Sequence, residues 1–141
     1  MATVTSPRIK TLLGGGFPGE RFSHKLVWDF DVDGGAFADA VRIGQVGSKG
    51  ILITEAYWHV ETACSSGGSA TLIIGIEGGD VDAFMDVTSG AVASLTDNAV
   101  GFETTGQGIY VAASSYILAD IGTANMTAGK VALYISGFQV E

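Results

Sequence analysis

The sequence predicts an all-β protein: a single-domain β-sandwich or jelly roll of about eight strands with an extended N-terminal arm. Glycine accounts for 21 of the 141 residues, about twice its average usage. The glycines separate short apolar runs rich in Val, Ile, Leu, Tyr and Phe, a pattern typical of strands joined by turns. Turns at such short spacing favour a sandwich. A chain of this length is expected to form one domain that needs no cross-links.

Most of the expected strands alternate apolar and polar residues, as a half-buried strand requires. In 51–62 this alternation places Ala56 and Trp58 on one face. Ile53 and Tyr57 then fall on the opposite face. The expected strands are 25–33, 38–46, 51–62, 70–77, 91–95, 99–104, 109–113, 116–122 and 130–140.

Residues 1–24 differ from the rest, and we expect them to form an extended arm beside a sandwich domain of residues 25–141. They hold both prolines of the chain and the run Gly14–Gly16, and they show no periodicity. Such a segment is flexible when free. An arm that becomes ordered on binding a partner would explain its apolar residues. The predicted residues of this capsid or subunit interface are Ile9, Leu12, Leu13, Phe17 and Phe22.

The composition argues against several classes of partner. A net charge of −8 with seven Lys and Arg disfavours nucleic acid and anionic membrane surfaces. No apolar run reaches the length of a membrane helix. Residues 1–10 lack the apolar stretch of a signal peptide, so we expect synthesis in a host cytoplasm. Cys64 is the one cysteine, which excludes an internal disulfide. Few charges and many apolar residues favour assembly with copies or a partner.

The stretch 29–34 has the D-x-D-x-D-G opening of a calcium loop. The twelfth position, where such a loop needs a bidentate Glu, is Ala40. The aspartates also alternate with aromatic residues at the period of a strand. We therefore expect a solvent-facing acidic row that ends in an Asp-Gly turn. A weaker cation site at Asp29, Asp31 and Asp33 stays open, since a cation would relieve the repulsion between three carboxylates on one face.

No pattern nominates a cofactor, a metal centre or a catalytic site, and we expect no enzymatic activity. The stretch 14–19 matches G-x-G-x-x-G, but no helical pattern follows it. Glu20 stands where the P-loop requires Lys. His24 and His59 are too few for a zinc site without Cys or carboxylate help.

Two further groups of polar residues have a catalytic and a structural interpretation. Asp80, Asp82 and Asp86 provide carboxylates of the kind that hydrolyse glycosides, but a turn between strands is their commoner use. His59 and Cys64 have the residue types of a catalytic thiol–imidazole pair. Because they lie five residues apart across a strand end, we interpret them as a strand histidine and a small loop thiol.

Three segments, 40–63, 67–84 and 121–136, resemble a group of tailed-bacteriophage structural proteins. In that group a strand ending in Ile-Gly leads through a short turn to an apolar strand. A T-L-x-I-G strand follows, with an acidic turn that ends in Asp-Ala-Phe. The chain closes on T-A-G-K-V and a last apolar strand. Residues 1–24 do not share the pattern.

The resemblance implies a virion protein, and specifically a capsid decoration (cement) protein on the outer shell of a tailed-phage head. It implies a β-rich homotrimer at local threefold positions, with the major capsid protein as its partner. A tail or fibre component is an alternative that the motifs do not separate from this role. A carbohydrate-binding β-sandwich is another, for which Tyr57 or Trp58 would form the aromatic platform.

Overall fold

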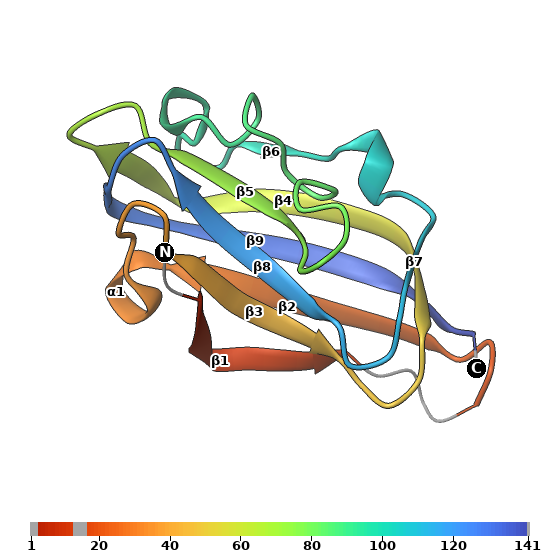
Figure 1. The fold of residues 1–141 in the computed structure, drawn as a ribbon. Helices are drawn as coiled ribbons and strands as arrows, with labels where there is room; N and C mark the ends of the chain where they lie inside the picture. The colour runs from red at the N-terminus through yellow and green to blue at the C-terminus, as the bar shows by residue number, and fades with distance from the viewer. Residues whose placement is uncertain (1–2, 13–16, 141) are drawn as a thin grey trace.

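A computed structural model describes residues 3–12 and 17–140, and most of these residues lie in β-strands (Figure 1). The strands are β1 (Thr3–Leu12), β2 (Arg21–Asp29), β3 (Ala40–Val46), β4 (Ile51–Ser66), β5 (Thr71–Ile76), β6 (Val100–Gly101), β7 (Ile109–Val111), β8 (Tyr116–Gly122) and β9 (Met126–Gln139). The helical turns are α1 (Phe30–Asp33), η1 (Val92–Ser94) and η2 (Thr104–Gly106). Within the described residues, no helix is long and apolar enough to cross a membrane.

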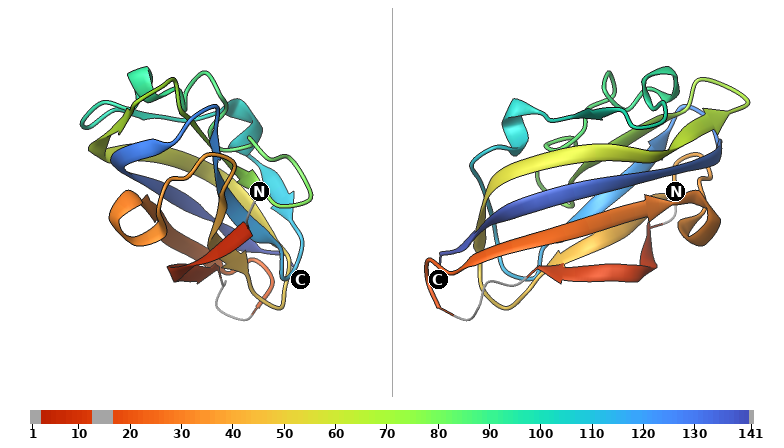
Figure 2. Two further views of the ribbon diagram at one scale, coloured as in Figure 1. Left: turned by 60° about the vertical axis from the view of Figure 1, so that its left-hand side comes forward. Right: turned by 180° about the vertical axis from the view of Figure 1, so that it is seen from behind.

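The strands form two sheets packed face to face, which confirms the predicted all-β sandwich (Figure 2). The four-stranded sheet has the order β1-β3-β8-β5. The five-stranded sheet has the order β2-β9-β4-β6, and β7 also pairs with β4. The pairing is antiparallel throughout, except that β1 runs parallel to β3. In the right-hand view of Figure 2, β2, β9 and β4 lie side by side across the outer face of the five-stranded sheet.

The core lies between the two sheets and is filled by the inward-facing residues of both. Trp28 of β2 is completely buried, and its indole N–H donates a 3.0 Å hydrogen bond to the carbonyl of Gly34. A buried tryptophan is stable because the ring leaves water while its one polar group keeps a partner. Other fully buried side chains are Leu26, Ile43, Ile53, Leu72, Ile74, Ile117 and Leu133. Each contributes roughly 1.5–3 kcal/mol through burial.

Most of the predicted strands occur in the structure, and 116–122 has the predicted bounds. The predicted strand 91–95 is wrong, since the η1 turn occupies 92–94 and Ala91 makes only an isolated bridge to Thr71. The segment 3–12, which the sequence analysis placed in an arm, forms β1 of the four-stranded sheet.

The predicted strand 25–33 is wrong in its last four residues, because the chain leaves β2 at Asp29 and enters α1. The Asp29 carboxylate accepts a 3.1 Å hydrogen bond from the backbone N–H of Asp31, which caps the helical turn. Gly34 ends the turn with a φ of 76°, a value that favours glycine. The aspartates thus start a helical turn instead of extending the strand.

Strand β4 changes the face that it turns to the core along its length. Ile53 is buried, and so are Ala56 and Trp58, although Ile53 has the opposite parity. The register between β4 and β9 shifts between Ile53 and Glu55. Such an irregularity turns every later side chain to the other face. The predicted constant alternation along 51–62 is therefore wrong.

The outer edge of β5 is covered by the connection that follows it. Ile74 pairs with Met85 through their backbones, and the N–H of Leu72 donates to the carbonyl of Gly90 at 2.8 Å. Covering an edge strand in this way prevents it from pairing with another chain. The connection passes so close to Gly75 that a Cβ there would overlap the backbone of Asp80 and Val81.

We predict that Gly75→Ala lowers the free energy of unfolding by about 2 kcal/mol or more, because the added methyl group displaces the backbone that covers β5. Gly67→Ala is the matched control, since a Cβ at Gly67 meets no heavy atom within 4 Å. It should change stability by less than about 0.5 kcal/mol. Urea unfolding of both variants measures the difference, and equal effects would contradict the close packing at Gly75.

Candidate functional site

His59 and Cys64 do not form a catalytic pair. The Nε2 atom of His59 lies 3.0 Å from the Oδ1 atom of Asn98 in an exposed contact. Cys64 belongs to the core cluster, and burial raises the pKa of its thiol to about 11. At neutral pH the thiol is therefore protonated and a poor nucleophile. The interpretation of Cys64 as a small apolar residue agrees with its position.

The carboxylates of Asp80, Asp82 and Asp86 form hydrogen bonds within the connection after β5. Asp82 shares a hydrogen bond with Asp80, and this contact raises the pKa of Asp82. The Oδ1 atom of Asp86 accepts a 2.9 Å hydrogen bond from the backbone N–H of Ser89, and the backbone contact lowers the pKa of Asp86. The N–H of Asp86 in turn donates to Glu103 at 2.8 Å. These contacts are those of a structured loop.

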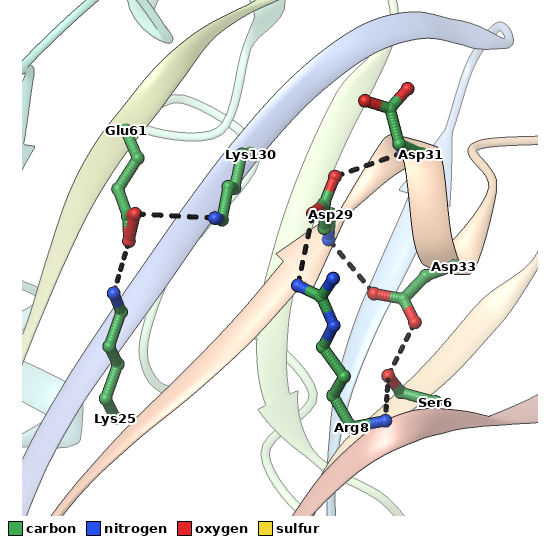
Figure 3. Close-up of polar contacts among 8 residues, drawn as sticks. All are labelled: Ser6, Arg8, Lys25, Asp29, Asp31, Asp33, Glu61 and Lys130. Carbon is green, nitrogen blue, oxygen red and sulfur yellow. Dashed lines mark hydrogen bonds and ion pairs between the residues drawn. The ribbon is translucent and has the colours of Figure 1, made fainter.

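Two of the three aspartates at 29–33 anchor strand β1 (Figure 3). The Asp33 carboxylate accepts a hydrogen bond from the Ser6 hydroxyl at 2.5 Å and one from the Asp29 backbone at 3.0 Å. Asp29 pairs with the Arg8 guanidinium at 3.3 Å. The predicted solvent-facing acidic row is therefore wrong, because Asp29 and Asp33 are half-buried and Asp31 alone of the three is exposed. In the part of the chain that the structure describes, no group of metal-binding side chains converges.

The residues predicted for the interface do not lie on one surface. Leu12 is completely buried and Phe22 is nearly so, and both belong to the core of this chain. Ile9 is half-buried, whereas Phe17 is 68% exposed. Leu13 lies outside the described residues. The interface role of these five residues stays a prediction, with Phe17 as its most exposed described member.

Strand β1 forms an edge of the four-stranded sheet. It pairs with β3 at Thr3–Thr5 and again at 10–12, with a register shift between Thr5 and Lys10. Ser6 and Leu12 are its two buried residues. Few buried contacts mean that a strand opens more easily than the rest of a fold. The predicted arm boundary at residue 24 lies inside β2, so the arm of the sequence analysis comprises β1, a connection and the start of β2.

The outer face of the five-stranded sheet carries an apolar patch that the sequence analysis did not predict. Tyr57 and Tyr134 are opposite each other on β4 and β9. Phe102 contacts Tyr57 edge-on, with 5.4 Å between the ring centroids. Val100 lies beside this group on β6, opposite His59. Tyr110 lies on the same face farther along β4, on β7 and opposite Leu52. The outer-face patch is defined as Tyr57, Val100, Phe102, Tyr110 and Tyr134, which are 42–72% exposed.

Figure 3 shows a charged cluster of Glu61, Lys25 and Lys130, which adjoins the patch through Lys25 and Tyr134. Glu61 forms a 2.6 Å ion pair with Lys25 through its buried Oε1 atom, and its Oε2 atom lies 3.8 Å from Lys130. The hydrogen bond between Lys25 and Glu61 lowers the pKa of Glu61 and raises the pKa of Lys25. The Lys25 ammonium also lies 5.7 Å from the centre of the Tyr134 ring. The cluster thus places two ammonium groups around one carboxylate at the margin of an aromatic surface.

Tyr57 and Trp58, the two aromatic candidates for a sugar platform, have opposite orientations. Trp58 is only 8% exposed and packs in the core. The close approach of Gly101 to its ring leaves no space for a Cβ at that position. Tyr57 belongs to the outer-face patch. The structure therefore leaves Tyr57 as the exposed member of the predicted pair.

The fold is shared with chains of three phage capsid structures. A chain of the capsid asymmetric unit of cyanophage Pam1 aligns with a TM-score of 0.60 at 17% identity, covering 92% of this chain and 91% of that one. A chain of the acidic stable capsid of Helicobacter pylori bacteriophage KHP30 aligns with a TM-score of 0.58 at 14% identity, covering 86% of this chain and 93% of that one. A chain of the capsid of Ralstonia phage GP4 aligns with a TM-score of 0.56 at 16% identity, covering 89% of this chain and 87% of that one. No family model and no curated protein matches the sequence.

These likenesses define the class of fold: a two-sheet β-sandwich that also occurs in chains of phage capsids. The shared fold extends over nearly the whole described chain. At identities below 20%, residue roles do not transfer with it.

We predict that Asp33→Ala loosens β1 and lowers the free energy of unfolding by about 2 kcal/mol, because two hydrogen bonds to a charged acceptor are lost. Trypsin should then cut faster after Arg8 and Lys10, which is measured by mass spectrometry of timed digests. Asp31→Ala removes the same charge from an exposed side chain and should leave the cleavage rate unchanged. Equal rates for the two variants would contradict the anchoring role of Asp33.

We also predict a pH-dependent contribution of Glu61 to stability. Lys25 holds the pKa of Glu61 below its ordinary value of 4.5, so the contact stabilises the fold above that pH. This stabilisation is lost as the pH falls through the folded-state pKa. The difference in unfolding free energy between wild type and Glu61→Gln should be largest near neutral pH and shrink in acid. Urea titrations across pH measure it, and a Lys25→Gln background should remove most of the pH dependence.

Proposed function

We propose that the protein is a non-enzymatic structural component of a phage virion, and that its role is capsid decoration. In this role it binds the outer shell of a tailed-phage head and stabilises the shell across capsomer seams. The observation that carries the proposal is the shared fold. Chains of three phage capsids match at least 86% of this chain over at least 87% of their own length. The resemblance of three sequence segments to tailed-phage structural proteins supports the same role independently.

A decoration protein needs exposed apolar surface and multiple copies. A capsid filled with DNA is under internal pressure, and added contacts across its seams resist that pressure. A specific interface buries about 1,200–2,000 Å² in total. Many copies bound together make detachment slow. We propose that the chain acts as a homotrimer, with the major capsid protein as its partner and the capsid surface as its location after synthesis in the host cytoplasm.

The N-terminal segment is the proposed clamp on the shell or on a neighbouring subunit. Phe17 is 68% exposed beside the start of β2, which leaves its ring in water in the isolated chain. Strand β1 is mostly exposed as well, so it can add contacts along its length. Extended segments commonly bind a partner through backbone pairing and a few apolar side chains.

The test is the addition of purified protein to capsids that lack it. We expect saturable co-sedimentation with the capsids and a higher temperature of DNA release from the decorated heads. Phe17→Ser should lower occupancy at equal protein concentration without lowering the melting temperature, because its ring is already exposed in the free chain.

Phe37→Ser is the matched control, because Phe37 is 53% exposed and lies outside the proposed clamp. It should bind as the wild type does. A wild-type protein that fails to bind capsids at any concentration would overturn the decoration role. Binding that Phe17→Ser leaves intact would overturn the clamp alone.

A further inference from the structure

The outer-face patch has the composition of an interface core. Four of its five members are aromatic, and tyrosine and phenylalanine are enriched where proteins meet. Together, five half-exposed side chains of this size present roughly 500 Å² of apolar surface. One partner in a standard interface contributes about 800 Å². The patch therefore supplies more than half of that area, and the polar residues around it can supply the rim.

The charges on this face cancel, whereas those on the rest of the chain do not. Alternation along the paired strands β2, β9 and β4 places three basic and three acidic residues on the outer face. They are Arg21, Lys25, Lys130, Asp29, Glu55 and Glu61. These six charges cancel, so the net charge of −8 comes from residues outside this set. Two copies of the chain therefore repel each other less through these three strands than through the acidic remainder of the chain.

Neutrality and exposed aromatic rings together favour one kind of occupant. A strongly basic partner would be drawn to the acidic surfaces and would gain nothing electrostatic at the outer face. A second copy of this chain can approach at the outer face with its acidic surfaces turned away. The edge-on pair of Tyr57 and Phe102 and the exposed Val100 then meet apolar surface of the same kind.

We propose that copies of this chain associate through the outer face of the five-stranded sheet, with the outer-face patch at the centre of the contact. The inference rests on the proposed function, in which several copies act together, and it names the surface that joins them. Because the uncompensated charge lies elsewhere, salt weakens the repulsion between copies. Association is therefore tighter at high than at low ionic strength.

The test is sedimentation velocity of the full chain over a range of concentrations and at two salt concentrations. The wild type is expected to sediment as a multiple of the chain mass, with a smaller dissociation constant at high salt. Val100→Asp places a carboxylate on a side chain that is 72% exposed in the free chain. It should raise the dissociation constant at least roughly 30-fold, because that carboxylate is buried without a partner in the contact.

Val87→Asp is the matched control, with the same substitution and charge change at a valine that is 56% exposed on the connection after β5. It should associate as the wild type does. Tyr57→Ser, which adds no charge, should weaken association in the same direction as Val100→Asp. Thermal melting of each variant confirms that it is folded.

Three results would overturn the inference. The first is a wild type that stays monomeric at all concentrations. The second is an equal change of the dissociation constant in Val100→Asp and Val87→Asp. The third is a monomeric protein whose patch variants lose only capsid binding. The last result would assign the face to the shell. Capsid binding by a monomeric wild type would refute this inference and leave the decoration role intact. Failure to bind capsids with self-association preserved would do the reverse.

Discussion

The antiparallel pairing of β4 with β9 is the interaction on which the rest of the structure depends. It runs from Ile51 opposite Gln139 to Ser66 opposite Met126. Strand β9 carries β2 on its other side, and β4 carries β6 and β7. The irregularity after Ile53 sets which residues of β4 face inward. This one shift in register therefore places Trp58 in the core and leaves the Tyr57 ring on the outer face.

Local alternation predicted most strands, because a period of two follows directly from the geometry of a half-buried strand. The strand 116–122 was predicted in full for this reason. The irregularity in β4 was missed because a shifted register has no local mark in the sequence. The turn α1 was missed because the Asp33-Gly34 pair suits a hairpin turn as well as the end of a short helix. The structure decides this choice through a partner distant in the chain, the Ser6 hydroxyl, which donates to Asp33 across 27 residues.

The candidate surfaces were only partly predictable. Apolar residues near the N-terminus were expected at an interface, but Leu12 and Phe22 complete the core of their own chain. A free arm and a docked edge strand have the same composition, so sequence alone does not separate them. Tyr57 and Tyr134 are large rings at positions that their strands turn to solvent. Their juxtaposition depends on the pairing of strands more than seventy residues apart, which no local pattern encodes.

The distribution of contacts gives the central ladder of β4 and β9 and the edge strand β1 different roles. The ladder of β4 and β9 is long and its inward residues are buried, so it holds the sandwich together. Strand β1 buries Ser6 and Leu12 and depends on polar contacts to Asp29 and Asp33. Its release would cost a small part of the total stability and leave the main sheets intact. An edge strand held in this way suits the proposed clamp, because the strand can change its partner while the scaffold that presents the outer face stays folded.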